Sequence, residues 1–246
     1  MKNLLAILFS SVVATTAAAQ SADAPSIRSG DTWTYRDTIE KPPNGWVETF
    51  DEITATRATS SSIYYSVRQR GSSQPPREVI AGSDWSRSRS INGVPTVINK
   101  PLSFPLKENA SWHTAYTEQH PNKLHSVESW DNSFRVLGYE SVEVPAGKFN
   151  AIKIESEGTW TAQADPAATV TMSSRVSQNG ATSVADIQKA STDPIGGRTY
   201  KVFWYVPEVK RWVKSVEEYY SSDNVRNEKY SSELQSYKVD AVRPAE

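Results

Sequence analysis

The chain contains no cysteine, and other chemical signatures are missing as well. Without cysteine there is no disulfide framework and no thiolate metal site. A lipid anchor of the bacterial lipoprotein kind also needs a cysteine, so we expect no lipid anchor. Glycine-rich phosphate loops, G-x-S-x-G nucleophile elbows and H-E-x-x-H helices are absent from the sequence too. We therefore expect a protein that is not an enzyme and that needs no cofactor.

An excess of charge of one sign is also missing, since 27 Lys+Arg stand against 28 Asp+Glu and give a formal net charge of −1. Near-neutrality argues against a dedicated nucleic-acid-binding protein, so we expect no nucleic-acid partner. Apolar runs are short. The run from Leu4 to about Ala14 has roughly eleven residues, too few to span a bilayer as a helix. We expect no membrane span.

That short run has the features of a secretory signal. It follows Lys2 and precedes the small residues Ala17-Ala18-Ala19. We expect residues 1–20 to be a signal peptide and the mature protein to be periplasmic or secreted. The remaining 226 or so residues are enough for one large β domain without disulfides. We expect residues 21–246 to form a single β-rich domain.

Alternating strand patterns and turn residues fill the mature chain, and helical periodicity is scarce. Val144-Pro-Ala-Gly-Lys-Phe149 predicts a three-residue hairpin loop with a bulge at Gly147. In Phe203-Trp-Tyr-Val-Pro-Glu-Val-Lys-Arg-Trp-Val213, Pro207 cannot donate to a ladder and is expected at the bend between two strands. Asn92-Gly93 predicts a two-residue hairpin. Hairpin-connected antiparallel pairing is the expected architecture.

The segment 161–197 differs in composition, because Ala, Ser, Thr and Asn dominate it. We expect a surface insertion between neighbouring strands, with a short strand near Val170 to Val176. A lid over a binding concavity is the alternative, since long irregular stretches inside a domain are functional or mobile.

Candidates for chemistry are few. His113, His120 and His125 cluster in the sequence, but their spacing matches no metal signature, so we expect no metal site. Glu155 and Glu157 share one face of a predicted strand, as paired catalytic acids would. A solvated polar stripe is the simpler interpretation. We therefore predict no catalytic residues.

Two groups of residues are candidates for binding. Trp85, Arg87 and Arg89 alternate on one face of a predicted strand from Trp85 to Ile91, which would suit an anionic partner. A charged edge strand that resists unwanted pairing is the alternative. The second group lies on and after a strand that is apolar on both faces, and it would line a ligand site: Phe203, Trp204, Tyr205 and Trp212. Core packing is the alternative for this second group.

The same hairpins resemble sequence elements of uncharacterised exported bacterial proteins of the domain-of-unknown-function type. Gly138-Tyr-Glu-Ser-Val-Glu-Val-Pro-Ala-Gly-Lys-Phe149 resembles their G-x-E-x-V-x-V-P-A-G-x-F-x-A element, with Ala151 at its end. Trp204-Tyr-Val-Pro-Glu-Val-Lys-Arg-Trp-Val-Lys214 and Glu233-Leu-Gln-Ser-Tyr237 resemble their W-Y-x-P-E-V-x-R-x-V-K and E-L-x-S-Y elements. Gly30-Asp-Thr-Trp-Thr-Tyr-Arg36 is similar to their start.

This resemblance implies a fold rather than a site. The implied fold is a single large antiparallel sheet curved into a half-barrel, similar in shape to periplasmic lipoprotein carriers; a β-sandwich is the alternative. It implies no catalytic or binding residues. Together with the aromatic candidates, it favours a periplasmic, non-enzymatic carrier of an apolar or amphipathic ligand such as a lipid. An envelope module that binds a protein partner is the alternative, and an uncharacterised hydrolase is third.

Overall fold

A computed structural model describes residues 21–41, 45–165, 170–178, 181–189 and 195–240. The side chains of the strands within 170–189 are not part of that description. The expected signal peptide, residues 1–20, lies outside the described residues.

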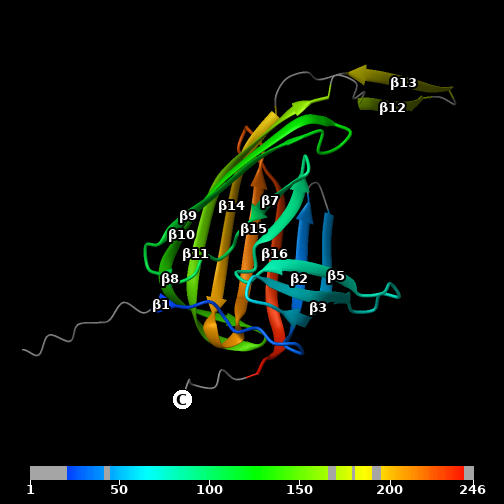
Figure 1. The fold of residues 1–246 in the computed structure, drawn as a ribbon. Helices are drawn as coiled ribbons and strands as arrows, with labels where there is room; N and C mark the ends of the chain where they lie inside the picture. Colours follow the sequence, from blue (N-terminus) through cyan, green and yellow to red (C-terminus); the bar gives the residue numbers. More distant parts are fainter. Residues whose placement is uncertain (1–20, 42–44, 166–169, 179–180, 190–194, 241–246) are drawn as a thin grey trace, which may run out of the picture.

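One curved, open, antiparallel sheet of ten strands forms most of the molecule (Figure 1). In spatial order its strands are β5 (Arg77–Gly82), β4 (Ser62–Gln69), β3 (Gly45–Ala58), β2 (Thr32–Lys41), β16 (Arg226–Lys238), β15 (Arg211–Tyr220), β14 (Ile195–Val206), β11 (Gly147–Ala164), β10 (His125–Val144) and β9 (Ser111–Gln119). This confirms the large curved antiparallel sheet expected from the sequence, in place of the sandwich.

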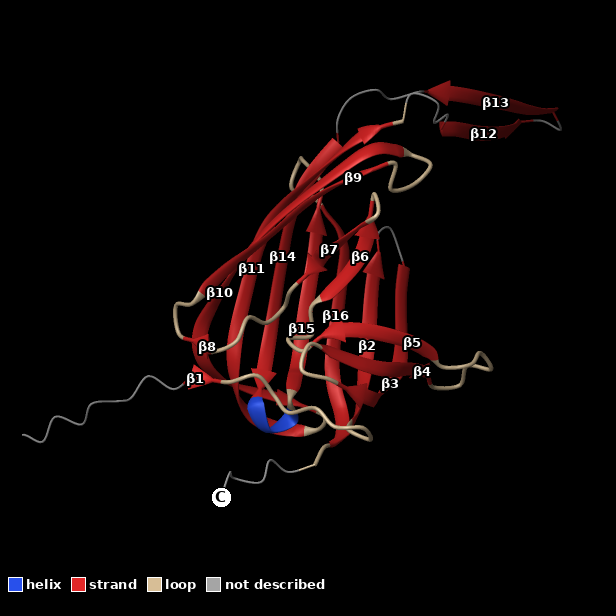
Figure 2. Cartoon of the chain, viewed as in Figure 1, coloured by secondary structure: helices blue, strands red, loops and turns tan. Residues whose placement is uncertain are grey.

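The other strands pair in twos outside that sheet. They are β1 (Ser21–Ala22) with β8 (Leu106–Lys107), β6 (Arg87–Ile91) with β7 (Val94–Asn99), and β12 (Val170–Gln178) with β13 (Ala181–Lys189). Among the described residues the one helical element is the 3-10 turn η1 (Pro207–Val209) (Figure 2). Within that described part, no helix is long and apolar enough to cross a membrane.

The hairpin loops follow the turn chemistry of the sequence with one correction. Asn92 and Gly93 have φ of 51° and 81° and join Ile91 directly to Val94, which confirms the two-residue hairpin. Pro207 lies at the predicted bend, where η1 ends on Lys210 in the left-handed region. The predicted three-residue loop after Val144 is wrong, since this residue pairs with Gly147 and only two residues intervene.

Strand β10 is longer than the sequence predicts. The sequence predicted two strands, from about Leu124 to Trp130 and from Ser133 to Val144, whereas the structure has one continuous strand. Asn132 lies at the expected break, but it pairs with both neighbouring strands and accepts a hydrogen bond from Thr199 Oγ1 at 2.8 Å. A polar residue that usually favours loops is thus satisfied inside the sheet. Strand β5 was not predicted.

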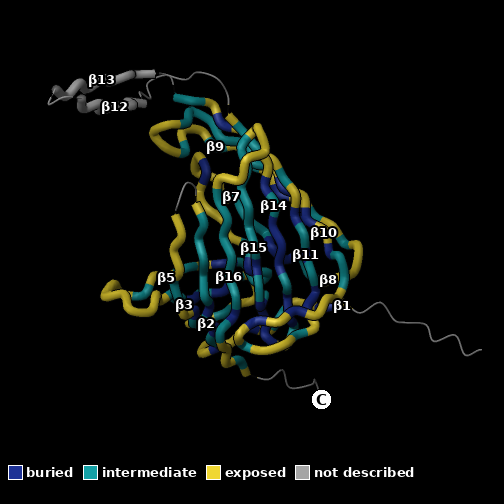
Figure 3. The backbone as a smooth tube through the Cα atoms, turned by 180° about the vertical axis from the view of Figure 1, so that it is seen from behind, coloured by how far each residue is buried: buried dark blue, intermediate teal, exposed yellow. Residues whose placement is uncertain are grey.

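The two faces of the sheet have different surroundings. The segment from Gly82 to Lys107, with the β6–β7 hairpin, lies across the concave face (Figure 2). Trp85, Leu102 and Phe104 of this segment pack against the sheet, and the first two are buried. Seen from behind, the strands are mostly buried or half-buried while exposed residues gather in the loops (Figure 3). The core therefore lies between the concave face and the covering segment.

Candidate functional site: a cavity on the concave face

A cavity of about 270 Å³ lies between the concave face and the covering segment. Its sheet side comes mainly from β2, β14, β15 and β16, and its cover comes from Trp85, Arg87, Asn99 and Pro101. Binding sites for small molecules usually have volumes of about 300–1,000 Å³. The cavity is slightly smaller than that range, so it suits a small molecule or one end of a longer one.

The register of the sheet decides which side chains reach this cavity. Phe203 of β14 lies opposite Ser215 of β15, which lies opposite Ser232 of β16, which lies opposite Asp37 of β2. Residues in one such row point to the same face of an antiparallel sheet. All four line the cavity. They are 195 residues apart at most in the sequence, so no local pattern predicts the row.

Aromatic rings form one wall of the cavity. Trp212 contacts Phe203 and Trp85 edge-on, with ring centroids 5.5 and 6.1 Å apart. Trp85 is held in place because its Nε1 donates to the carbonyl of Lys210 at 3.0 Å, and its ring also packs on Trp33 at 5.4 Å. Edge-to-face pairs of this kind add stability beyond the apolar area that they bury. Several ring contacts and one hydrogen bond therefore hold the aromatic wall in place.

Arg211 lies inside that wall. Its guanidinium carbon is 4.1 Å from the ring centre of Trp85, 4.3 Å from that of Trp212 and 5.4 Å from that of Tyr35. Only 7% of the residue is exposed, yet Nε and Nη1 have no hydrogen-bond partner among the described residues. Buried arginines are normally paired and hydrogen-bonded, because a buried charge without a partner is costly. Arg211 is the chemically unusual group of this site.

Two carboxylates, Glu217 and Asp37, share the cavity with Arg211, and they have different partners. Glu217 is neutralised by Lys201, whose Nζ lies 3.2 Å from its Oε2, and it also accepts from the hydroxyl of Tyr219. Asp37 has no such cation within ion-pair distance among the described residues, and it accepts a hydrogen bond from Ser232. Burial raises the pKa of the Asp37 carboxyl, while the Ser232 hydrogen bond and the Arg211 charge lower it by less.

Asp37→Asn is expected to raise the thermal midpoint relative to wild type at pH 7, and by less at pH 4. The pKa of Asp37 is raised in the folded state above its ordinary value of 3.8. Its contribution to stability is therefore fully present below that ordinary value and is lost as the pH rises through the folded-state pKa. Asparagine keeps the uncharged state at every pH. Thermal melts at the two pH values measure the difference.

Glu78→Gln on β5 is the matched control for this prediction, because that carboxylate is exposed. Its midpoint should follow wild type at both pH values. An Asp37→Asn midpoint that differs from wild type equally at pH 4 and pH 7 would show that folding does not raise the pKa of Asp37.

The structure separates the four predicted lining residues. Phe203 and Trp212 line the cavity. Trp204 lies on the opposite, convex face, where its ring is near Lys153 and Lys214. Tyr205 is fully buried and packs edge-on against Phe104 at 5.5 Å, outside the cavity lining. The sequence could not resolve these positions because the strand is apolar on both faces.

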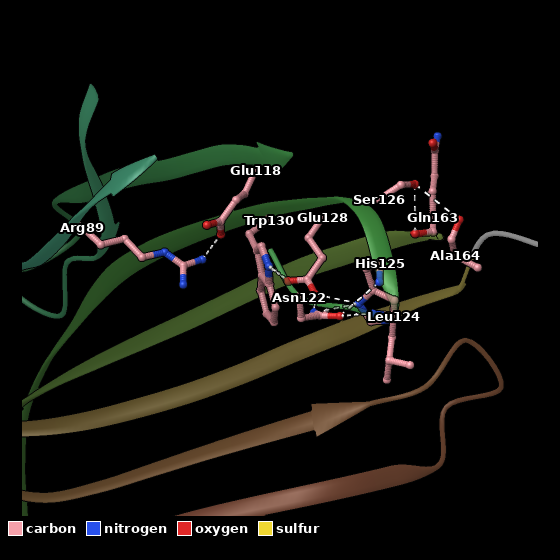
Figure 4. Close-up of polar contacts among 10 residues, drawn as sticks. All are labelled: Arg89, Glu118, Asn122, Leu124, His125, Ser126, Glu128, Trp130, Gln163 and Ala164. Atoms are coloured by element: carbon pink, nitrogen blue, oxygen red, sulfur yellow. Dashed lines mark hydrogen bonds and ion pairs between the residues drawn. The ribbon is translucent and has the colours of Figure 1, made fainter. Parts of the chain in front are cut away.

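Trp85, Arg87 and Arg89 do not form one exposed face. The predicted strand from Trp85 is wrong at its start, because Trp85 has φ of 60° in a turn and β6 begins at Arg87. Trp85 is buried in the aromatic wall, and Arg87 lines the cavity. Arg89 forms an ion pair with Glu118 of β9 (Figure 4). Its guanidinium carbon lies 5.9 Å from the Tyr116 ring centre.

Each of the three histidines has different surroundings. His125 Nδ1 lies 2.7 Å from Glu128 Oε1 at the open end of β10, with Asn122 beside it (Figure 4). His113 Nε2 lies 2.8 Å from Asp131 Oδ1, and His120 occupies a turn with φ of 49°. In the described ranges, no three residues of the His, Cys, Asp and Glu types converge as a metal site would require.

Glu155 and Glu157 have separate surroundings as well. Glu155 accepts a hydrogen bond from the hydroxyl of Tyr200 on the neighbouring strand, and Glu157 is exposed. Burial and this carboxylate raise the pKa of the Tyr200 hydroxyl. Neither glutamate lines the cavity on the concave face.

The local sequence pattern did not predict the polar half of the cavity, above all Arg211 and Asp37. The alternation of β15 gave no signal for Arg211, because a register shift at Trp204/Tyr205 brings this arginine and its neighbour Trp212 to the same cavity.

No family model matches the chain, and no curated protein matches it. A protein of Bacteroides fragilis thought to be exported, with a YmcC-like fold, is similar over 88% of this chain and 99% of its own, at 14% identity and a TM-score of 0.43. A protein of Parabacteroides distasonis thought to be a lipoprotein is similar over 89% and 100%, at 14% identity and a TM-score of 0.41. Neither name states a ligand or a reaction. The motif resemblance given above stays a prediction.

Proposed function

We propose that this chain is an exported, non-enzymatic binding or carrier module for a small amphipathic molecule. The observation that supports it is the cavity of about 270 Å³, with aromatic rings on one side and hydroxyl, carboxylate and guanidinium groups on the other. Pockets that bind small molecules combine an apolar lining with a few polar groups that orient the ligand. The signal-like residues 1–20 support a periplasmic or secreted location.

Native mass spectrometry of the protein purified from a bacterial envelope tests the proposal. A co-purifying amphiphile of a few hundred daltons supports the carrier. A stoichiometric protein partner would instead support an interaction module, whose structural basis would be the edges β5 and β9, unpaired in the described part of the sheet.

Ser215→Phe is expected to abolish this co-purification and to weaken binding of an added amphiphile such as decanoate at least about tenfold. Ser215 is buried at the cavity wall between Phe203 and Ser232, so a phenyl ring there fills much of the space a ligand would use. Titration calorimetry measures the loss, and near-ultraviolet circular dichroism checks that the aromatic wall is intact.

Lys214→Phe is the matched control. It places the same ring one residue earlier on β15, on the convex face where Lys214 pairs with Glu233 at 2.9 Å. Binding should match wild type. Equal loss in both variants, or no loss in Ser215→Phe, would refute a binding site in this cavity.

A further inference from the structure

We propose that Arg211 binds an anionic group of the ligand, so that the ligand is a small amphiphile with one carboxylate or phosphate head and a short apolar tail. This inference rests on the proposed function and goes further, because it assigns the chemical class of the ligand and the residue that selects it.

The first observation is the set of unused hydrogen-bond donors on Arg211. A guanidinium has five N–H donors in a planar fork that matches the oxygens of a carboxylate or phosphate. Only 7% of Arg211 is exposed in this protein, and its Nε and Nη1 groups have no hydrogen-bond acceptor among the described residues. A buried donor without an acceptor costs stability. A ligand oxyanion would supply the missing acceptors.

The rings around Arg211 fix its position without using those donors. The faces of Trp85 and Trp212 lie 4.1 and 4.3 Å from the guanidinium carbon. Cation–π contacts stabilise the charge through the face of the ring and leave the in-plane N–H groups free. The same rings line the cavity, so the guanidinium is held at its wall in advance of binding.

The other charges of the cavity leave a positive excess at this point. Lys201 neutralises Glu217 by an ion pair at 3.2 Å. Arg87 lines the cavity in addition to Arg211, and Asp37 is the remaining carboxylate. Two guanidinium groups therefore stand against one carboxylate, which favours an anionic ligand over a cationic one.

A second polar atom in the lining also has no partner. Asn99 Oδ1, at the end of β7, is buried and accepts no hydrogen bond from the described residues. A hydroxyl or protonated oxygen on the ligand head would satisfy it. Two unsatisfied polar groups in one cavity are difficult to explain by packing alone, because buried polar atoms are nearly always paired.

A row of aromatic side chains leads from this cavity along the concave face and offers a place for the tail. Tyr230 lines the cavity and contacts Tyr219 at 5.8 Å, which contacts Trp130 at 6.3 Å. Trp130 stacks on Trp160 at 5.8 Å and on Tyr116 at 6.4 Å. All five rings are half-buried, so each keeps surface that an apolar chain can cover.

Titration calorimetry with matched ten-carbon probes, each below its micelle concentration, tests this inference. The probes are decanoate, decyl phosphate, decanol and decylammonium. Wild type is expected to bind the two anions about ten to a hundred times more tightly than decanol, since a hydrogen bond to a charged group is worth that much. Arg211→Met should bind all four alike, and Arg211→Lys should keep part of the preference.

Arg36→Met is the matched control, because Arg36 lies on the convex face beside Tyr35 and pairs with Glu233 at 2.6 Å. It should keep the wild-type preference. Equal binding of decanoate and decanol by wild type overturns the role of Arg211 but leaves the carrier standing. Failure of every probe to bind refutes the carrier as well. Tighter binding of decylammonium would assign the head to Asp37 and refute an anionic ligand.

Two further results would overturn the inference. Inorganic phosphate or acetate that binds as tightly as the ten-carbon anions would show a plain anion site without a tail. Retention of the anion preference in Arg211→Met would show that Arg211 is a structural residue held by its rings. If Arg211→Met fails to fold, the headgroup series on wild type and on Arg211→Lys still decides between these outcomes.

Discussion

Lys210→Met is expected to lower the free energy of unfolding by about 3–5 kcal/mol, because it leaves a buried carboxylate without its cation. Lys210 Nζ lies 2.9 Å from Asp31 Oδ2, and both side chains are 1% exposed. Asp31 also accepts the backbone N–H groups of Arg28 and Asp240 at 2.9 Å each. The ion pair therefore joins the beginning and the end of the described chain to the bend after β14.

Urea denaturation followed by far-ultraviolet circular dichroism measures this loss. Lys214→Met is the control, since Lys214 forms a half-exposed pair with Glu233 and should cost about 0–1 kcal/mol. The double variant Asp31→Asn with Lys210→Met should recover part of the loss, because no uncompensated charge remains. A Lys210→Met value within 1 kcal/mol of the Lys214→Met value would show that Asp31 is not effectively buried.

Trp33→Ala is expected to cost about 3–5 kcal/mol as well, through a cavity in the core. Trp33 is 0% exposed, its ring packs edge-on against Trp85 at 5.4 Å, and its Nε1 donates to the carbonyl of Val209 at 2.8 Å. Removal of the indole thus opens a void behind the aromatic wall and leaves a buried carbonyl unpaired. The same urea titration measures it.

Trp46→Ala on β3 is the matched control, because Trp46 is 61% exposed. Surface substitutions of this kind usually stay within about 0.5 kcal/mol of wild type. Equal losses in the two variants would contradict the assignment of Trp33 to the core. Ligand binding by Trp33→Ala should weaken too, since Trp85 loses its support.

The residues of these two predictions show a structural role of the sequence elements at residues 30–36 and 204–214, beside the Arg211 and Trp212 side chains that the second element contributes to the cavity. Segments 30–36 and 204–214 meet at one end of the sheet, where Asp31 binds Lys210 and the Tyr35 hydroxyl donates to the carbonyl of Trp212 at 2.5 Å. The turn after Val144 joins them, since Ala146 N–H donates to the carbonyl of Leu234 at 3.0 Å. These elements build the corner that supports the cavity.

Local sequence patterns predicted much of the fold. Alternation, Asn92-Gly93 and Pro207 predicted antiparallel strands and their bends, because strand faces and turns depend on neighbours only a few residues away. The long strand through Asn132 was missed, since its polar side chain is satisfied by Thr199 from a strand 67 residues away. Strand β5, Arg77–Gly82, has a mixed pattern that local rules did not separate from loop.

Only part of the candidate site could be predicted from the sequence. The sequence identified Phe203 and Trp212 as aromatic candidates but ranked Trp204 and Tyr205 with them. Alternation on a doubly apolar strand does not say which face is concave. Strand pairing determines which residues face the cavity. The register shift at Trp204/Tyr205 and the row that aligns Asp37 with Phe203 show this in the structure.

The sequence by itself determined the absence of disulfides, the near-neutral charge and an antiparallel β architecture, because composition and short-range periodicity carry that information. Only the tertiary structure decided that Arg211 lies among Trp85, Trp212 and Tyr35 with its Nε and Nη1 donors unused by the described residues. These rings are up to 177 residues apart in the chain. The environment of a buried charge depends on which distant strands pair and in which register, and no local pattern encodes that.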